Sequence, residues 1–198
     1  MKTVVIASNN KNKIYEFNKI LNLPDIKFIS MSEAGYFDDI IEDGNTFEEN
    51  ALIKARAVSN ALGCIAISDD SGLEVEALDN APGIYSARYA GGHDDEANNA
   101  LLLKNLKNVE NRRARYACSI CIYHPNGDYR ITKAYCYGKI IDERRGHNGF
   151  GYDPYFYVEE FNATLAEVSI EQKNTISHRA KAIKEILEVC DENLNFKR

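Results

Sequence analysis

Residues 64–75 read CIAISDDSGLEV, an apolar run that changes abruptly into a pair of carboxylates. The run from Cys64 to Ile67 has the length and the β-branched content of a buried strand. Ser68-Asp69-Asp70-Ser71-Gly72 follows at once, and carboxylates at the end of a strand indicate a functional site. Leu73 and Val75 then alternate with polar residues, which is typical of an extended segment.

The segments before this stretch carry both strand-like and helix-like patterns. A β-branched run at 3–7 and an apolar run at 26–30 predict two short strands, and Ile14, Phe17 and Leu21 predict a helix between them. The acidic, irregular segment 31–45 is typical of a loop that presents carboxylates.

A second helix is marked at both ends. Thr46-Phe47-Glu48-Glu49 matches a capping box, and Ala51, Ala55 and Val58 follow at helical spacing. Gly63 is the residue type that most often ends a helix in the left-handed conformation. We therefore expect a helix between Thr46 and Gly63.

The segments after this stretch predict a hairpin of two long strands between helices. The Asn126-Gly127 pair is a strong signal for the hairpin turn. The expected elements are a helix at 94–106, strands at 115–123, 129–141 and 156–158, and a final helix introduced by Ser177.

The composition describes an ordinary globular chain. The 198 residues are 44% hydrophobic and 27% charged, which excludes a disordered or collagen-like protein. The net charge of −6 gives no broad attraction to a polyphosphate backbone, so we do not expect a nucleic acid polymer as partner. The apolar run from Val4 to Ala7 is too short for a signal peptide, and no stretch approaches a membrane span, so we expect a cytoplasmic protein.

The five cysteines are expected to be reduced thiols of the core, because most of them lie in apolar runs. The spacing of Cys118 and Cys121 resembles that of a metal-binding pair. However, the two residues lie in a predicted strand, where positions three apart point to opposite faces. This placement argues against a zinc site.

The polar loop from Ser8 to Lys13 lies between a predicted strand and a predicted helix. Backbone amides at a helix N-terminus bind anions, and Lys13 adds a full positive charge. The alternative is a solvated connection with surface lysines, because the loop lacks the glycine pattern of a P-loop.

Adjacent carboxylates repel each other, so Asp69 and Asp70 can be buried together only beside a cation. Glu42 lies upstream, and Asn50 and Lys54 lie one turn apart on the capped helix. Two or three carboxylates at a cleft suit Mg²⁺, which prefers hard oxygen ligands and keeps waters and substrate phosphates in its shell. In the alternative interpretation, Asp69 or Asp70 only caps a turn ahead of the following Ser and Gly.

Two further clusters follow in the second half of the chain. In Gly149-Phe150-Gly151-Tyr152-Asp153-Pro154 the glycines permit close approach of a ligand, Phe150 offers a stacking face and Asp153 accepts hydrogen bonds. Lys173 with Ser177-His178-Arg179 supplies donors that fit a phosphate or carbonyl oxygen. The alternatives are an aromatic-rich structural turn for the first cluster and a solvated helix start for the second.

Together and in this order, these motifs resemble the inosine triphosphate pyrophosphatase family over essentially the whole chain. The resemblance rests on Ser8–Lys13, Thr46–Ala51, Ser68–Leu73, Ala81–Tyr89, Gly149–Pro154 and Ile176–Arg179. One departure is the first loop, where the family has Thr-Gly-Asn and this chain has Ser8-Asn9-Asn10. Ser8 keeps the hydroxyl group, whereas Asn9 lacks the conformational freedom of glycine.

The resemblance implies hydrolysis of non-canonical purine nucleoside triphosphates, namely ITP, dITP and XTP, to the monophosphate and pyrophosphate. It implies Mg²⁺, with Mn²⁺ as an alternative, held by Glu42, Asp69 and Asp70. Asp70, Asp69 and Lys54 would be catalytic, and Asp70 would orient and deprotonate the attacking water. The implied substrate-binding residues are Ser8, Asn9, Asn10, Lys11, Asn12, Lys13, Ser71, Phe150, Gly151, Tyr152, Asp153, Lys173, His178 and Arg179.

Two other functions remain open on the sequence alone. One is a related metal-dependent pyrophosphatase for a pyrimidine or modified nucleotide, and the other is a nucleotide sensor without chemistry. The pair Asp69-Asp70 together with Lys13 argues against the sensor, because a binder has little reason to keep costly adjacent carboxylates.

The expected fold is α/β (mixed-sheet α+β), with a long curved mixed β-sheet flanked by helices. Residues 1–198 would form one pyrophosphatase domain of two lobes with a central nucleotide-binding cleft. The resemblance also implies a homodimer. Tyr116, Tyr123, Tyr135 and Tyr137 are candidates for its contact, or else they belong to the core.

Overall fold

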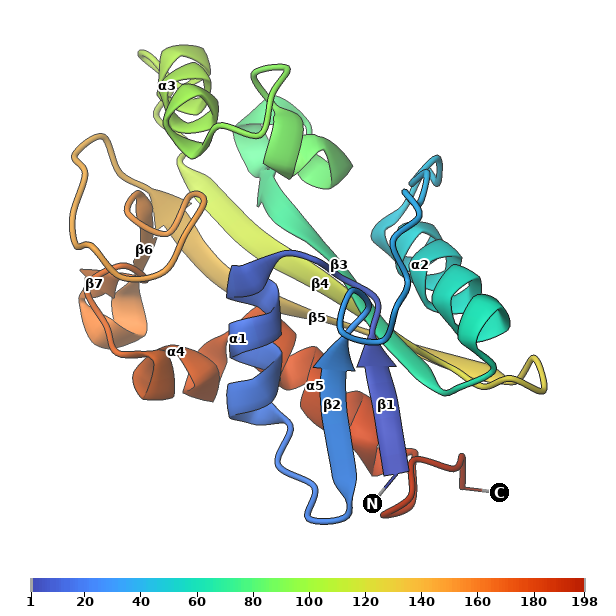
Figure 1. Ribbon diagram of the computed structural model, residues 1–198. Coiled ribbons are helices and arrows are strands. Elements are labelled where there is room, and N and C mark those ends of the chain that lie inside the picture. Colours follow the sequence, from blue (N-terminus) through green and yellow to red (C-terminus); the bar gives the residue numbers. More distant parts are fainter. Residues whose placement is uncertain (1, 198) are drawn as a thin grey trace. The chain divides into compact units, whose positions relative to one another are not determined.

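The computed structural model describes residues 2–197, which form one seven-stranded sheet and five α-helices (Figure 1). The strands are β1 (Lys2–Ile6), β2 (Ile26–Ser30), β3 (Ala66–Val75), β4 (Arg113–Tyr123), β5 (Tyr129–Ile140), β6 (Phe156–Val158) and β7 (Ala163–Thr164). The helices are α1 (Lys11–Ile20), α2 (Phe47–Leu62), α3 (Asp95–Asn105), α4 (Ile170–Ile176) and α5 (His178–Glu188).

The strand order is β2-β1-β3-β4-β5-β6-β7. Strand β1 pairs in parallel with β2 and β3, whereas β6 pairs antiparallel with β5 and β7. The sheet is therefore mixed, and the predicted α/β class is confirmed. Among the helices of residues 2–197, none is both long enough and apolar enough to cross a membrane.

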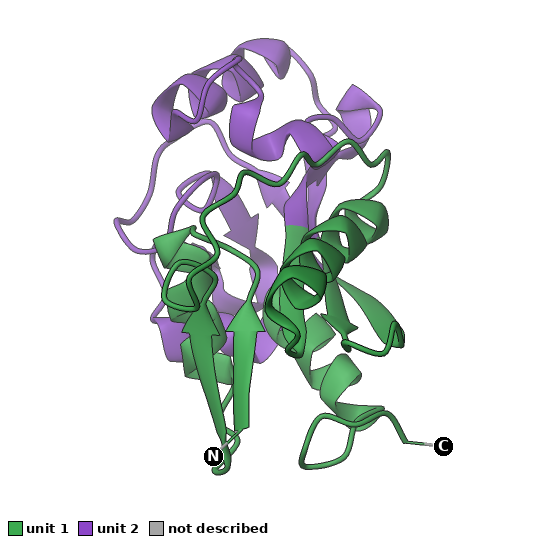
Figure 2. Cartoon of the chain, turned by 45° about the vertical axis from the view of Figure 1, so that its right-hand side comes forward, with its two compact units in different colours: residues 1–70, 118–134, 179–198 green, residues 71–117, 135–178 purple. Residues whose placement is uncertain are grey.

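The chain divides into two compact units (Figure 2). The first unit contains residues 1–70, 118–134 and 179–198, and the second contains 71–117 and 135–178. Strands β3, β4 and β5 each contribute residues to both units.

In the first unit, helices pack on both faces of the strands because strand side chains alternate between faces. Val4 and Ile6 of β1 share a core cluster with Phe17 of α1 and Ile183 of α5. Val5, the residue between them, packs in a separate cluster that contains Val58 of α2. Helices α1 and α5 thus cover one face, and α2 covers the other.

The second unit has its own core. Leu73 and Val75 of β3 pack with Leu102 of α3, Tyr116 of β4 and Phe156 of β6. Tyr116 is therefore a core residue, which agrees with the core alternative predicted for the tyrosines. Tyr137, in contrast, is 65% exposed.

Most predicted elements are confirmed, but one differs in extent and two were missed. Strand β3 does not end at Ile67 but continues unbroken through Ser68–Gly72 to Val75. Helix α4 and the short strand β7 were not expected, although Ser169 and Gln172 form a capping box that marks the start of α4. The five cysteines are free, as predicted, and Cys118 and Cys121 lie within β4.

The N-terminal cap of α2 is built by one side chain. The Thr46 hydroxyl accepts a hydrogen bond from the Glu49 amide at 3.1 Å. The Glu49 carboxylate accepts from the Asn45 amide and not from Thr46, so the reciprocal half of the predicted capping box is displaced by one residue. At the other end, Gly63 takes the predicted left-handed conformation with φ of 63°.

Removing the Thr46 cap should lower the free energy of unfolding. We expect Thr46→Ala to lower the free energy of unfolding by about 1 kcal/mol, because an amide of the first turn loses its acceptor. Thr46→Ser keeps the hydroxyl and should stay close to the wild type. Urea unfolding followed by circular dichroism measures both variants, and equal losses in the two would contradict the capping role.

Candidate active site

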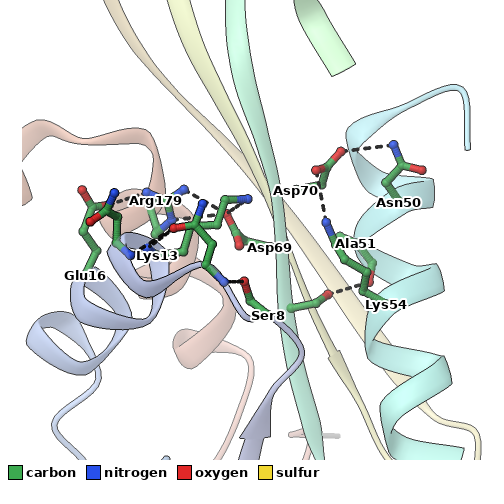
Figure 3. Close-up of polar contacts among 12 residues, drawn as sticks. Ser8, Lys13, Glu16, Asn50, Ala51, Lys54, Asp69, Asp70 and Arg179 are labelled. Atoms are coloured by element: carbon green, nitrogen blue, oxygen red, sulfur yellow. Dashed lines mark hydrogen bonds and ion pairs between the residues drawn. The ribbon is translucent and has the colours of Figure 1, made fainter. Parts of the chain in front are cut away.

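The two aspartates of β3 point to opposite faces of the sheet. Asp69 has the same parity as Ile65 and Ile67, whose side chains pack on the face covered by α1 and α5. Asp70 has the parity of Ala66, which packs on the face covered by α2. Figure 3 shows the two carboxylates with separate sets of partners.

Asp70 is held by two residues of α2. The Lys54 ammonium lies 3.2 Å from Asp70 Oδ1, and the Asn50 amide nitrogen donates to Asp70 Oδ2 at 3.2 Å. Lys54 and Asn50 are one turn apart, so they share a helix face, as the sequence indicated. Ser68 also points to this face and donates to the Ala51 carbonyl oxygen, which docks the helix against the strand.

The acidic loop that precedes α2 is anchored to the same group. Glu42 Oε2 lies 2.5 Å from the Lys54 ammonium, which therefore bridges two carboxylates. The amide of Gly44 donates to Asn50 Oδ1 at 2.9 Å. A side chain at Gly44 would collide with Asn50, since a Cβ there would lie 2.7 Å from Oδ1. Asn50 thus joins the loop that carries Glu42 to Asp70.

The charges of this group influence one another. Burial raises the pKa of Asp70, and the negative charges of Glu42 and Asp69 raise it further, while Lys54 and Lys13 oppose the shift. Burial alone would lower the pKa of Lys54, but Asp70 and Glu42 outweigh it and the pKa of Lys54 is raised. Lys54 therefore remains protonated, and Asp70 is a carboxylate with increased basicity.

The donor chemistry of Glu42 and Asp70 suits Mg²⁺. Both end in hard carboxylate oxygens, and these oxygens already hold one cation, the Lys54 ammonium, between them. The structure differs from the predicted set of three ligands, because Asp69 points away to the other face. Within residues 2–197, no three His, Cys, Asp or Glu side chains gather into a group that could hold a metal ion. The residues fit an ion held by two carboxylates and completed by water and phosphate oxygens.

Asp69 belongs to a buried network of alternating charges on the face of α1 and α5. Its Oδ2 accepts from Arg179 Nη2 at 2.9 Å and lies 3.1 Å from the Lys13 ammonium. Arg179 Nη1 also donates to Glu16 of α1. Asp69, Glu16 and Arg179 are each at most 3% exposed.

The network keeps Asp69 ionised. Burial favours its protonated form, but the positive charges of Lys13 and Arg179 dominate and hold the pKa of Asp69 well below its usual range. For Arg179, burial acts in the opposite direction, and the carboxylates of Asp69 and Glu16 raise the pKa above its ordinary value. Asp69 therefore holds Lys13 and Arg179 in place, and its basicity is reduced.

The loop from Ser8 to Lys13 differs in detail from the predicted anion cradle. Lys11, Asn12 and Lys13 already belong to the first turn of α1. Asn10 caps that helix, since its Oδ1 accepts from the amides of Asn12 and Lys13 at 3.0 and 3.1 Å. Ser8 Oγ accepts from the Asn10 amide at 3.1 Å. Asn9, Lys11 and Asn12 are exposed residues of this loop.

The second unit brings together Phe150, Asp153 and Lys173. Asp153 Oδ2 accepts from the Phe150 amide at 3.0 Å and from the Lys173 ammonium at 2.8 Å. The same ammonium lies 5.3 Å from the centre of the Phe150 ring. Gly149 has φ of +73°, and a Cβ there would lie 2.1 Å from Asp153 Oδ2, so only glycine fits.

The remaining predicted residues of this unit have structural partners. The His178 ring stacks on Tyr116 at a centroid distance of 4.8 Å. Burial, followed by the charge of Asp153, raises the pKa of Tyr116 well above its usual value, so its hydroxyl stays protonated. Tyr152 donates its hydroxyl to the Ser86 carbonyl oxygen at 2.7 Å, and Ser71 lies within β3.

Two sequence expectations thus need correction, and one residue was missed. Arg179 was expected to approach a base, but it is 1% exposed and binds Asp69 and Glu16. Asp69 was expected to share a metal with Asp70, but the two lie on opposite faces. Glu16 was not singled out, although an acidic residue beside Phe17, on the buried face of a helix, signals a buried cation partner.

Breaking the buried network should cost far more stability than breaking a surface pair. We expect Arg179→Met to lower the free energy of unfolding by about 3–5 kcal/mol, because it leaves Asp69 and Glu16 buried without their shared cation. Arg145→Met removes an arginine of the partly exposed pair with Glu167 and should change stability little. Urea unfolding compares the two variants, and similar losses would contradict the importance of the network.

The contribution of Asp69 to stability should depend on pH. Its pKa is lower in the folded protein than in the unfolded chain, so its contribution is present above about pH 4 and is lost as the pH falls further toward the folded pKa. We expect the stability difference between the wild type and Asp69→Asn to be largest near neutral pH and to shrink below about pH 4. Urea unfolding across this range measures it; a constant difference would refute the expectation.

Comparisons with known proteins agree with the resemblance seen in the motifs. A sequence model of the Ham1 family matches residues 4–189. A protein of Desulforamulus reducens named dITP/XTP pyrophosphatase is 48% identical over 191 residues, which are 95% of this chain and 95% of the relative. A protein of Staphylococcus aureus with the same name is 50% identical over 184 residues, or 92% of this chain and 93% of the relative.

Solved structures show the same fold. The structure of the Staphylococcus aureus Ham1 protein matches with a TM-score of 0.86 at 48% sequence identity, and the match covers 94% of this chain and 97% of that one. A HAM1 protein from Coxiella burnetii matches with a TM-score of 0.87 at 40% identity, covering 96% of this chain and 98% of that one. The chain belongs to the Ham1 family.

Proposed function

We propose that this protein hydrolyses non-canonical purine nucleoside triphosphates, namely ITP, dITP and XTP, to the monophosphate and pyrophosphate, and so cleanses the nucleotide pool. The relatives named dITP/XTP pyrophosphatase support the reaction and the substrate class. The observation that carries the proposal is the buried group of Asp70, Lys54 and Asn50, with Glu42 on the same lysine.

Asp70 is the proposed general base. Its raised pKa makes it a better proton acceptor than an ordinary carboxylate, and Asn50 and Lys54 fix both of its oxygens. From this position it orients the attacking water and takes its proton. A divalent cation at Glu42 and Asp70, Mg²⁺ or alternatively Mn²⁺, supplies neutralisation of phosphate charge when bound.

Lysines carry the remaining electrostatic stabilisation. Phosphoryl transfer depends mainly on positioning and on neutralising charge at the phosphate oxygens. Lys54 is a protonated lysine beside the base, and Lys13 is held in place by Asp69. Together with Ser8, Asn10 and Ser71, these side chains are the proposed phosphate ligands.

The second unit supplies the proposed base recognition. Phe150 offers a stacking face, and Asp153 and Lys173 lie beside it. His178, which stacks on Tyr116, is the third proposed hydrogen-bonding group. Hypoxanthine and xanthine carry an oxygen at position six where adenine carries an amino group. A donor aimed at this oxygen would meet another donor in adenine and lose its partner, which disfavours ATP.

We further infer that the protein works in the cytoplasm as a homodimer. The dimer is inferred from the family resemblance.

The reaction is tested by a nucleotide panel. We expect release of pyrophosphate from ITP, dITP and XTP that depends on Mg²⁺, with much less from ATP, GTP and dUTP. Asp70→Asn should lower turnover by about 100-fold or more, since a general base contributes at least that factor. Asp142→Asn, at an exposed aspartate paired with Arg112, is the matched control and should keep full turnover.

The outcomes separate the alternatives. Release from a pyrimidine or modified nucleotide alone would keep the chemistry and overturn the base assignment. Nucleotide binding without any release would identify a sensor. Full activity of Asp70→Asn would refute the role of Asp70 while leaving the substrate assignment intact.

A further inference from the structure

The segment from Gly149 to Asp153 lacks regular secondary structure of its own. Gly149 and Gly151 both have positive φ angles, 73° and 62°, on either side of Phe150. Glycine loses more conformational freedom on folding than any other residue. A stacking face between two glycines therefore needs external contacts to hold its direction.

Helix α3 holds the backbone on both sides of Gly151. The Gly151 amide donates to Asp95 Oδ2 at 2.8 Å, and the Gly151 carbonyl oxygen accepts from Asn99 Nδ2 at 2.9 Å. The amide belongs to the peptide group shared with Phe150, and the carbonyl to the peptide group shared with Tyr152. Both dihedral angles of Gly151 are therefore set by contacts to α3.

The same contacts fix Phe150. Its own amide donates to Asp153 Oδ2 at 3.0 Å, and the peptide group that follows it is held by Asp95. The two peptide groups that flank Phe150 are thus both anchored. Since the backbone determines where the first bond of a side chain points, this anchoring aims the aromatic ring.

Asn99 is placed to donate hydrogen bonds. It is 2% exposed, and its Nδ2 donates both to Gly151 and to the Asp95 carbonyl oxygen. Its Oδ1, however, has no hydrogen-bond partner among residues 2–197. A buried acceptor without a donor is costly and calls for a functional explanation. The gain that offsets it is the pair of donors that fixes the loop.

Asn98, the neighbouring residue, binds a different segment of the chain. It is equally buried, but it accepts from the Ala90 amide and donates to the Ala87 carbonyl oxygen. Two adjacent asparagines of one helix thus bind two different segments. Of these two asparagines, Asn99 is the one that binds the segment carrying Phe150.

We propose that Asn99 and Asp95 are positioning residues for base selection, which act through the Gly151 backbone on Phe150 and Asp153. This inference rests on the proposed function, because it assigns Phe150 to the stacking of a purine base. Asp95 and Asn99 lie one helical turn apart, on the same face of α3. Asp95 is exposed to water and Asn99 is buried, so Asn99 has the larger effect.

The test compares Asn99→Ala with Asn98→Ala. In Asn99→Ala we expect KM for ITP to rise by roughly three- to tenfold, the change that follows loss of the hydrogen bond to the Gly151 carbonyl oxygen. Turnover should stay within about twofold, because Asp70 and Lys54 are untouched, and the preference for ITP over ATP should fall. Asn98→Ala should keep both KM and the preference. Asp95→Asn retains an acceptor for the Gly151 amide and should resemble the wild type more than Asp95→Ala does.

A readout independent of activity is amide hydrogen exchange measured by NMR on the full chain. Exchange at Gly151 and Phe150 should accelerate in Asn99→Ala and remain slow in Asn98→Ala. Unchanged KM, base preference and exchange in Asn99→Ala would overturn the positioning role. A wild type that hydrolyses no purine triphosphate would refute the proposed function and the role in base selection, and accelerated exchange would then establish only a structural contact.

Discussion

The structure of the site depends on one constraint: adjacent residues of a strand cannot point the same way. Strand β3 carries Asp69 and Asp70 through the middle of a sheet that is covered by helices on both faces in the first unit. Each carboxylate is buried, and each must be compensated on its own side. The sequence therefore has to supply two sets of cations from separate elements, and it does so from α2 on one side and from α1 and α5 on the other.

This division separates the carboxylate proposed to act in the reaction, Asp70, from the carboxylate that holds the structure together, Asp69. On the α2 side the compensation is incomplete, because Lys54 serves both Asp70 and Glu42, and the basicity of Asp70 is raised. On the opposite side, Asp69 has two cations, and its proton affinity is suppressed. Two chemically identical neighbours thus acquire opposite properties from their surroundings.

Periodicity and end signals were sufficient to predict most of the elements, including α2 with its Thr46 cap and the hairpin of β4 and β5. They failed at 68–72, because serine, aspartate and glycine are typical of turns. Pairing within the sheet and burial by helices from distant sequence keep these residues in a strand. The candidate site residues were predicted because chemically suitable residue types occur together in short motifs. The partners of Asp70 were grouped with it through the spacing on α2, but the pairing of Glu16 with Arg179 was missed. That pairing spans 163 positions, and no local pattern encodes it.

The surroundings of the free cysteines determine how readily oxidants react with them. Burial raises the pKa of Cys118 and of Cys64, and it raises the pKa of Cys190 to about 11. Oxidants attack the thiolate, and at neutral pH these thiols are almost entirely protonated. The proposed chemistry uses carboxylates and amines, which contain no redox-active atom. Oxidation of these thiols at neutral pH is therefore disfavoured.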